Sequence, residues 1–124
     1  MRVSEQTRDQ VMTVIQRLVE ALGRKDVGGI LALTDVDFRG FWSDAGDKVV
    51  GKEALQRYLE QDSAPPDLIR LEISSIHISA EGTVAWVMAD VRFNMVGGGA
   101  REGLLTAVLR GTGHTWLFAQ VHCS

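Results

Sequence analysis

The segment TVAWVMADVRFNMVGGGAREGLLTAVLR, residues 83–110, has the alternation of two β-strands joined by a glycine turn. Every odd-numbered residue from Ala85 to Met95 is apolar, whereas the even-numbered residues mix large apolar and polar side chains. Successive side chains of a strand point to opposite faces, so this pattern predicts one dry face and one mixed face. Three consecutive glycines, 97–99, separate the two strands and predict a hairpin loop.

The alternation continues on both sides of this hairpin. We place four consecutive strands near Ile69–Ser79, Thr83–Val96, Arg101–Arg110 and Thr115–Cys123, with a bulge at Ser74-Ser75. Tight turns between neighbouring strands predict an antiparallel sheet. We interpret Arg101 and Glu102 as charged residues at the edge of a strand.

The first half of the chain has helical periodicity instead. Apolar residues from Val11 to Leu22 recur at the i, i+3, i+4 spacing of an amphipathic helix. Asp26 is placed to cap a short second helix through Leu33, and a strand at 38–42 precedes a third helix at Lys52–Gln61. Helices followed by an antiparallel sheet indicate an α+β fold.

Composition narrows the class of protein. The chain has 124 residues with 45% hydrophobic content, which predicts one domain spanning residues 1–124. A net charge of -3 gives no attraction for nucleic acid or anionic lipid. The polar N-terminus and the lack of a long apolar run predict a cytoplasmic protein without a membrane span. The single cysteine, Cys123, forms no zinc-ligand pattern, so no metal is expected.

The two sheet faces suggest a cavity and a partner. Apolar side chains on both faces need cover on both faces, and three helices in a chain this short cover only one. We expect the odd-numbered face to form a homodimer and the mixed, even-numbered face to line a pocket for a small apolar or aromatic molecule. The expected ligand-binding residues are Trp42, Tyr58, Trp86, Arg92, Thr106, Gln120 and His122.

Four motifs resemble SnoaL-like domains of the nuclear-transport-factor-2-like superfamily. They are Gly51-Lys52-Glu53-Ala54-Leu55, Gly82-Thr83-Val84-Ala85-Trp86-Val87, Leu105-Thr106-Ala107-Val108-Leu109-Arg110, and the ending from Trp116 through His122-Cys123-Ser124. The resemblance implies a cone-shaped fold: three N-terminal helices on a curved, mainly antiparallel sheet, a cystatin-like α+β barrel with an internal pocket. It also implies frequent dimerisation through the outer face of the sheet.

The resemblance leaves the chemistry open, because this superfamily contains both enzymes and binding modules. Ketosteroid isomerase needs an aspartate base and an oxyanion hole made of a tyrosine and a protonated acid. Alignment puts Leu18 at the tyrosine and Trp42 at the base, so that reaction is not expected. Two functions remain: a small-molecule-binding protein, or a cofactor-independent isomerase, cyclase or hydrolase using His122 with Asp90 or Asp44.

Overall fold

A computed structural model describes residues 3–42, 48–61 and 68–124 of the chain. The helices are α1 (Glu5–Arg24), α2 (Val27–Ala32) and α3 (Lys52–Glu60). The strands are β1 (Thr34–Trp42), β2 (Val49–Val50), β3 (Leu68–Glu81), β4 (Val84–Met95), β5 (Ala100–Gly111) and β6 (Trp116–Cys123). The α+β fold, the three helices and the four consecutive strands predicted from the sequence are confirmed.

The helices begin and end where the sequence supplies caps. The Ser4 side chain accepts a hydrogen bond from the Thr7 backbone N–H at the start of α1, and Lys25 ends the helix with a left-handed φ of 55°. The Asp26 carboxylate caps α2 by accepting from the Gly29 N–H at 3.0 Å. The capping role expected of Asp26 is therefore confirmed.

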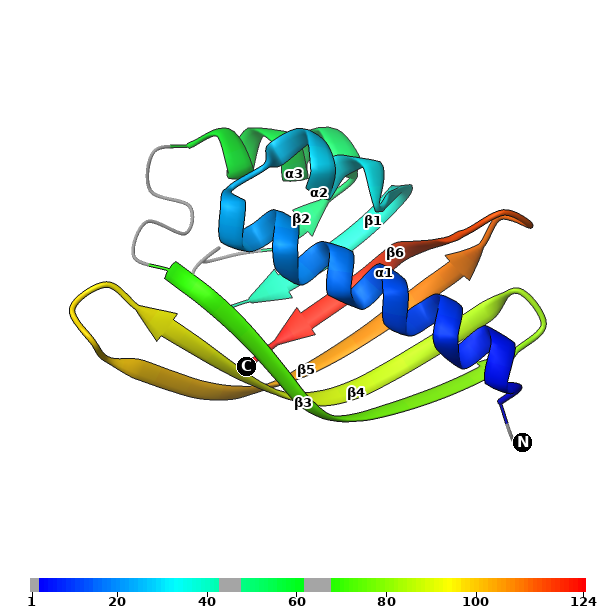
Figure 1. Ribbon diagram of the computed structural model, residues 1–124. Coiled ribbons are helices and arrows are strands. Elements are labelled where there is room, and N and C mark those ends of the chain that lie inside the picture. Colours follow the sequence, from blue (N-terminus) through cyan, green and yellow to red (C-terminus); the bar gives the residue numbers. More distant parts are fainter. Residues whose placement is uncertain (1–2, 43–47, 62–67) are drawn as a thin grey trace.

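The six strands form one curved sheet in the order β2-β1-β6-β5-β4-β3 (Figure 1). All neighbours are antiparallel except β1 and β6, which run parallel. This parallel pair and the short β2 were not predicted, because the partner of an isolated strand cannot be identified from alternation alone. The bulge in β3 is confirmed: the register with β4 shifts between Ser74 and His77, and Ser75 has a φ of 51°.

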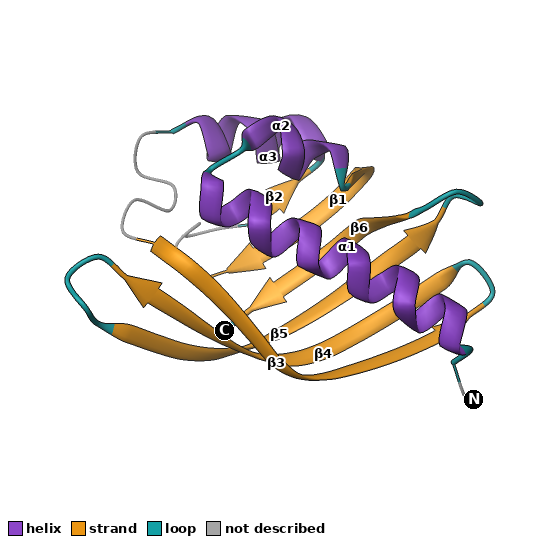
Figure 2. Cartoon of the chain, in the orientation of Figure 1, coloured by secondary structure: helices purple, strands orange, loops and turns teal. Residues whose placement is uncertain are grey.

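Helix α1 lies across one face of the sheet, and α2 and α3 lie over its β1–β2 end (Figures 1 and 2). The face under α1 is the odd-numbered one: Ala85, Val87, Ala107 and Leu109 are at most 3% exposed and pack with Val11 of α1. The small alanines allow the helix to approach the sheet closely. We call this the inner face.

The facing expected from the sequence is therefore wrong. The even-numbered residues of β4 and β5 point away from the helices, and we call their side of the sheet the outer face. The physical reason is that α1 needs a continuous apolar surface, which only the odd-numbered face supplies. A mixed face can contact water at less cost.

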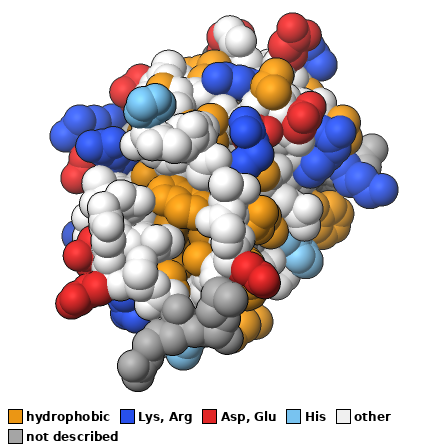
Figure 3. Space-filling model, turned by 90° about the vertical axis from the view of Figure 1, so that its right-hand side faces the viewer, with side chains coloured by type: hydrophobic (Ala, Val, Ile, Leu, Met, Phe, Trp, Pro, Cys, Tyr) orange, Lys and Arg blue, Asp and Glu red, His pale blue; other side chains and the backbone are white. Residues whose placement is uncertain are grey.

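Charges of both signs are distributed around the end of the molecule shown in Figure 3. A shallow hollow near the middle of that view exposes apolar side chains. Within the described part of the chain, no helix is both long enough and apolar enough to cross a bilayer.

Candidate functional site

A cavity of ≈ 210 Å³ lies between the three helices and the inner face of the sheet. Each helix contributes aliphatic or aromatic side chains to its wall, among them Leu22 of α1, Ile30 of α2 and Leu55 of α3. The sheet contributes Leu71, Leu105 and Phe118. The lining is mostly apolar with a few polar groups, which is the composition of small-molecule pockets.

Strand β1 and helix α3 build an aromatic wall on this cavity. Phe38 and Trp42 lie on the same face of β1, with ring centroids 6.5 Å apart. Tyr58 of α3 meets the Trp42 ring edge-to-face at 5.2 Å and 68°. Such tilted arrangements are the favoured geometry of aromatic pairs. The two rings hold each other at the cavity wall.

The apolar side chains of α3 lie on one face of the helix, and this face points toward the cavity. Leu55, Tyr58 and Leu59 have the i, i+3, i+4 spacing of one helix face, and all three line the cavity. The helix is anchored to β1 just before its first turn, where the Gly51 N–H donates to the Phe38 carbonyl at 2.7 Å. The apolar face of α3 and the inward face of β1 therefore meet at the cavity wall.

Polar groups inside the cavity are few. The Thr34 hydroxyl donates to the Ile30 carbonyl oxygen at 2.8 Å, so this buried group is already bonded within the protein. Burial raises the pKa of the Cys123 thiol to about 11, which keeps it protonated at neutral pH. Arg101 lies at the end of the cavity beside Phe93 and Met95.

The expected binding residues separate into two groups. Trp42 and Tyr58 line the cavity together. Trp86 is 46% exposed on the outer face, so the expectation that it shares a cavity wall with Trp42 is wrong. The other expected residues, Arg92, Thr106, Gln120 and His122, are also exposed and do not line this cavity. All five residues miss the cavity because the even-numbered face of the sheet points away from the helices.

A second bulge, in β6, changes the facing along that strand. Val108 of β5 pairs with Gln120, but its neighbour Leu109 pairs with Phe118, so Ala119 is an extra residue. Phe118 therefore faces inward, whereas Gln120 and His122 face outward. Simple parity had placed Phe118, Gln120 and His122 on one face. Insertion of one residue reverses every side chain beyond it.

The proposed catalytic residues do not form a site in this cavity. His122 pairs across the outer face with Thr106, and Asp90 pairs with Leu104 one row further along the sheet. Among the residues the structure describes, no hydrogen bond joins His122 to Asp90, and the His122 ring instead lies edge-on to Phe41 at 5.2 Å. Asp44 lies outside the described residues. In residues 3–42, 48–61 and 68–124, no cluster of three potential metal ligands occurs.

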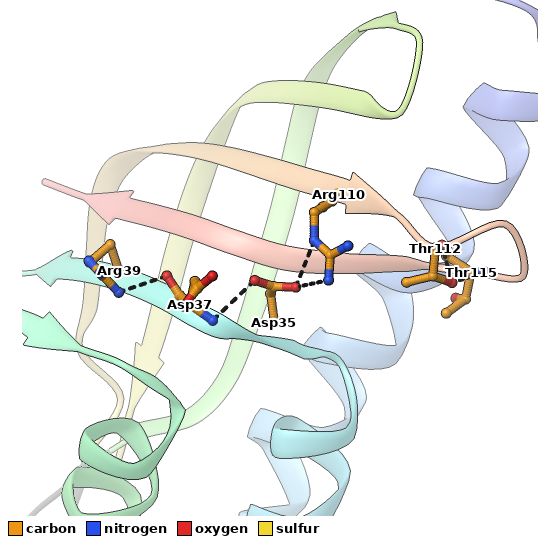
Figure 4. Close-up of polar contacts among 6 residues, drawn as sticks. All are labelled: Asp35, Asp37, Arg39, Arg110, Thr112 and Thr115. Atoms are coloured by element: carbon orange, nitrogen blue, oxygen red, sulfur yellow. Dashed lines mark hydrogen bonds and ion pairs between the residues drawn. The ribbon is translucent and has the colours of Figure 1, made fainter.

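A partly buried ion pair that the sequence did not predict links β1 to β5 across β6. Arg110 donates two hydrogen bonds to the Asp35 carboxylate, one from Nε at 2.9 Å (Figure 4). Asp35 also accepts from the Asp37 N–H at 3.1 Å. The Arg110 hydrogen bonds lower the Asp35 pKa, and burial opposes this only in part. The partners are 75 residues apart, so no local sequence signal could connect them.

Other residues that line the cavity were missed by sequence reasoning. Two of them, Phe93 and Leu105, belong to the odd-numbered positions that were assigned to a dimer interface. The available signal was the wide apolar stripe of the first helix, which required the driest sheet face as its partner.

The family described as the SnoaL-like domain matches residues 11–124. No curated protein sequence shows significant similarity to the chain. A protein of unknown function with a cystatin-like fold from Nostoc punctiforme is 17% identical with a TM-score of 0.81, over 99% of this chain and 93% of that one.

Two further solved structures show the functional range of this fold. The CamKII hub homology domain of Chlamydamonas reinhardtii is 21% identical with a TM-score of 0.77, covering 95% of this chain and 97% of that chain. A candidate scytalone dehydratase from Novosphingobium aromaticivorans is 14% identical with a TM-score of 0.79, covering 94% and 82%. At these identities the similarity establishes the cystatin-like fold alone.

Proposed function

This chain belongs to the SnoaL-like domain family, and we propose that it binds a small apolar or aromatic molecule in the cavity between its helices and its sheet. The observation that carries the proposal is the Trp42–Tyr58 aromatic pair on the wall of a mostly apolar cavity. Flat aromatic surfaces supply large contact area at fixed geometry, which suits a ligand of similar shape.

The alternative function is a cofactor-independent isomerase, cyclase or hydrolase. It required His122 with Asp90 or Asp44 at the cavity, but His122 and Asp90 are on the outer face. A general acid or base acts within hydrogen-bond reach of the reacting group. The placement of His122 and Asp90 therefore favours binding over acid–base catalysis as the function of this cavity.

The chain's single cysteine provides a test of the binding site. We expect neutral 2-naphthylacetamide, titrated by calorimetry, to bind the wild type saturably. Cys123→Phe adds a ring to the cavity and should weaken binding by at least about tenfold, since overpacking of this kind costs about 1–3 kcal/mol. Cys123→Ser changes little volume and should bind within about twofold of the wild type.

A second measurement covers the case in which Cys123→Phe misfolds. In the wild type, bound 2-naphthylacetamide should slow modification of Cys123 by methyl methanethiosulfonate, because the ligand occupies the space beside the thiol. Saturable binding that leaves the Cys123 modification rate unchanged would place the ligand elsewhere on the protein and contradict the proposal.

We also propose that the outer face is covered by a second copy of the chain. Several large apolar side chains are exposed there, and such patches are unusual on monomers. They are Phe41, Val84, Trp86, Met88 and Leu104. The homodimer predicted from the sequence is retained, but through the even-numbered face in place of the odd-numbered one. A two-fold contact would pair this face with itself.

A further inference from the structure

We infer that the ligand of this cavity is an apolar molecule ending in a carboxylate, with the carboxylate held by Arg101 at the cavity rim. The inference rests on the proposed function of the cavity and adds the chemical class of its ligand. Three features carry it: the position of Arg101, the state of its guanidinium group, and the lack of a second cation among the described residues that line the cavity.

Arg101 is positioned by the β4–β5 hairpin. It pairs with Phe93 of β4, and both residues line the cavity together with Met95. Arg101 has the parity of Leu105, which faces the buried interior from the same strand. Unlike Leu105, Arg101 is exposed, so it lies at the boundary between the apolar wall and solvent.

The Arg101 guanidinium group is open to a ligand. Arg70 and Arg110 form ion pairs with Glu72 and Asp35, and Arg39 donates to backbone carbonyls. The Arg101 side chain, by contrast, makes no hydrogen bond or ion pair with any described part of the chain. A guanidinium presents a planar fork of donors that matches both oxygens of a carboxylate.

Charge elsewhere on the described wall does not compete with this role. Arg101 is the only cationic residue among the described residues that line the cavity. Glu102 also lines the cavity, but it follows Arg101 on the strand and therefore has the opposite parity. It pairs with Arg92 and lines the outer-face groove as well. No buried side-chain polar atom in the described residues lacks a hydrogen-bond partner. An apolar interior next to one cation at the rim suits a hydrocarbon with one terminal anion.

The test compares three probes that share one hydrocarbon: 2-naphthylacetic acid, 2-naphthylacetamide and 2-(2-naphthyl)ethylamine. We expect the acid to bind the wild type about 3- to 10-fold more tightly than the amide, a range reduced for the solvent exposure of the pair. The amine should bind most weakly, because it brings a second cation to Arg101. Arg101→Gln should bring the acid to the affinity of the amide and leave the amide unchanged.

Arg92→Gln is the matched control, since it removes the same charge from the neighbouring strand on the outer face. It should preserve the preference for the acid, and circular dichroism should show that both variants fold. Equal affinity of acid and amide for the wild type would overturn the carboxylate inference while leaving the binding proposal intact. Failure of all three probes to bind would overturn both the carboxylate inference and the binding proposal. If Arg92→Gln lost the preference for the acid to the same extent as Arg101→Gln, the preference would come from the net charge of the protein, and the role of Arg101 would be overturned.

Discussion

Asp35 shows how one residue can be buried and still ionised. Its exposed fraction is 3%, yet Arg110 and the Asp37 N–H satisfy its carboxylate oxygens. Arg110 itself is half exposed, with 52% of its side chain accessible, so part of the attraction is screened by water. The pair joins β1 to β5, which are not neighbours in the sheet, and thereby helps to hold β1 beside β6.

Asp35→Asn should reduce the free energy of unfolding by about 1–2 kcal/mol at neutral pH, since a charge-assisted hydrogen bond is replaced by a neutral one. The folded-state pKa of Asp35 is lowered, so its contribution is present above the ordinary aspartate pKa and is lost as pH falls through and below about 4. Urea unfolding should therefore show the two proteins converging in acid.

Asp37→Asn is the control for this measurement. It removes the same charge from a side chain that is exposed and lies only two residues further along the chain. It should change stability little at either pH. A difference between wild type and Asp35→Asn that stayed constant from neutral pH to pH values below 4 would contradict the role of the ionised carboxylate.

Strand β1 carries the aromatic wall because of a glycine between the two rings. A Cβ atom at Gly40 would lie 2.7 Å from Phe38 Cε2 and closer still to the Trp42 ring. Only a residue without a side chain lets both rings fold over the strand at this point. Gly40 is therefore a determinant of the cavity shape, although it contributes no lining atom of its own.

Gly40→Ala should displace the Phe38 and Trp42 rings and destabilise the protein by about 1–3 kcal/mol, the usual cost of overpacking. The same displacement should weaken 2-naphthylacetamide binding, measured by calorimetry beside thermal unfolding. Gly99→Ala is the control, since a Cβ there meets no atom within 4 Å. Wild-type stability and affinity in Gly40→Ala would show that the rings do not depend on this glycine.

At the scale of the whole molecule, both faces of the sheet carry apolar side chains, and the helices that the structure describes cover only one of them. The cavity occupies the covered face, and a group of exposed apolar residues that includes Phe41, Trp86 and Met88 lies on the other. On the outer face, one row runs across the sheet through Phe41, His122, Thr106, Met88 and His77. His122 is thus placed for a contact between subunits, if the proposed dimer forms, and not for contact with a ligand in the cavity.

Sedimentation equilibrium at micromolar concentration should give the mass of a dimer. The double variant Trp86→Lys, Met88→Glu places charges at two exposed apolar positions of the outer face and should yield a monomer. Val96→Lys replaces another exposed apolar residue, beyond the end of β4, and should remain dimeric. A wild type that sediments as a monomer would remove the proposed partner while leaving the cavity unaffected.

The sequence determined most of the elements and the family, because periodicity, caps, turns and short motifs are local. Helix α1, the Asp26 cap, the β3 bulge at Ser74-Ser75 and the four-stranded meander all follow from residues close together in the chain. It also identified Trp42 and Tyr58 as cavity candidates, and both line the cavity. That residues 1–124 form one domain remains a prediction from the length of the chain.

Only the tertiary structure decided which sheet face points inward. Alternation shows that a strand has two different faces, but the choice between them depends on which surface α1 covers, and that is a long-range contact. The extra residue at Ala119, the Asp35–Arg110 pair and the position of Arg101 at the rim also depend on strand register. Register joins residues far apart in the chain, so no local pattern could supply it.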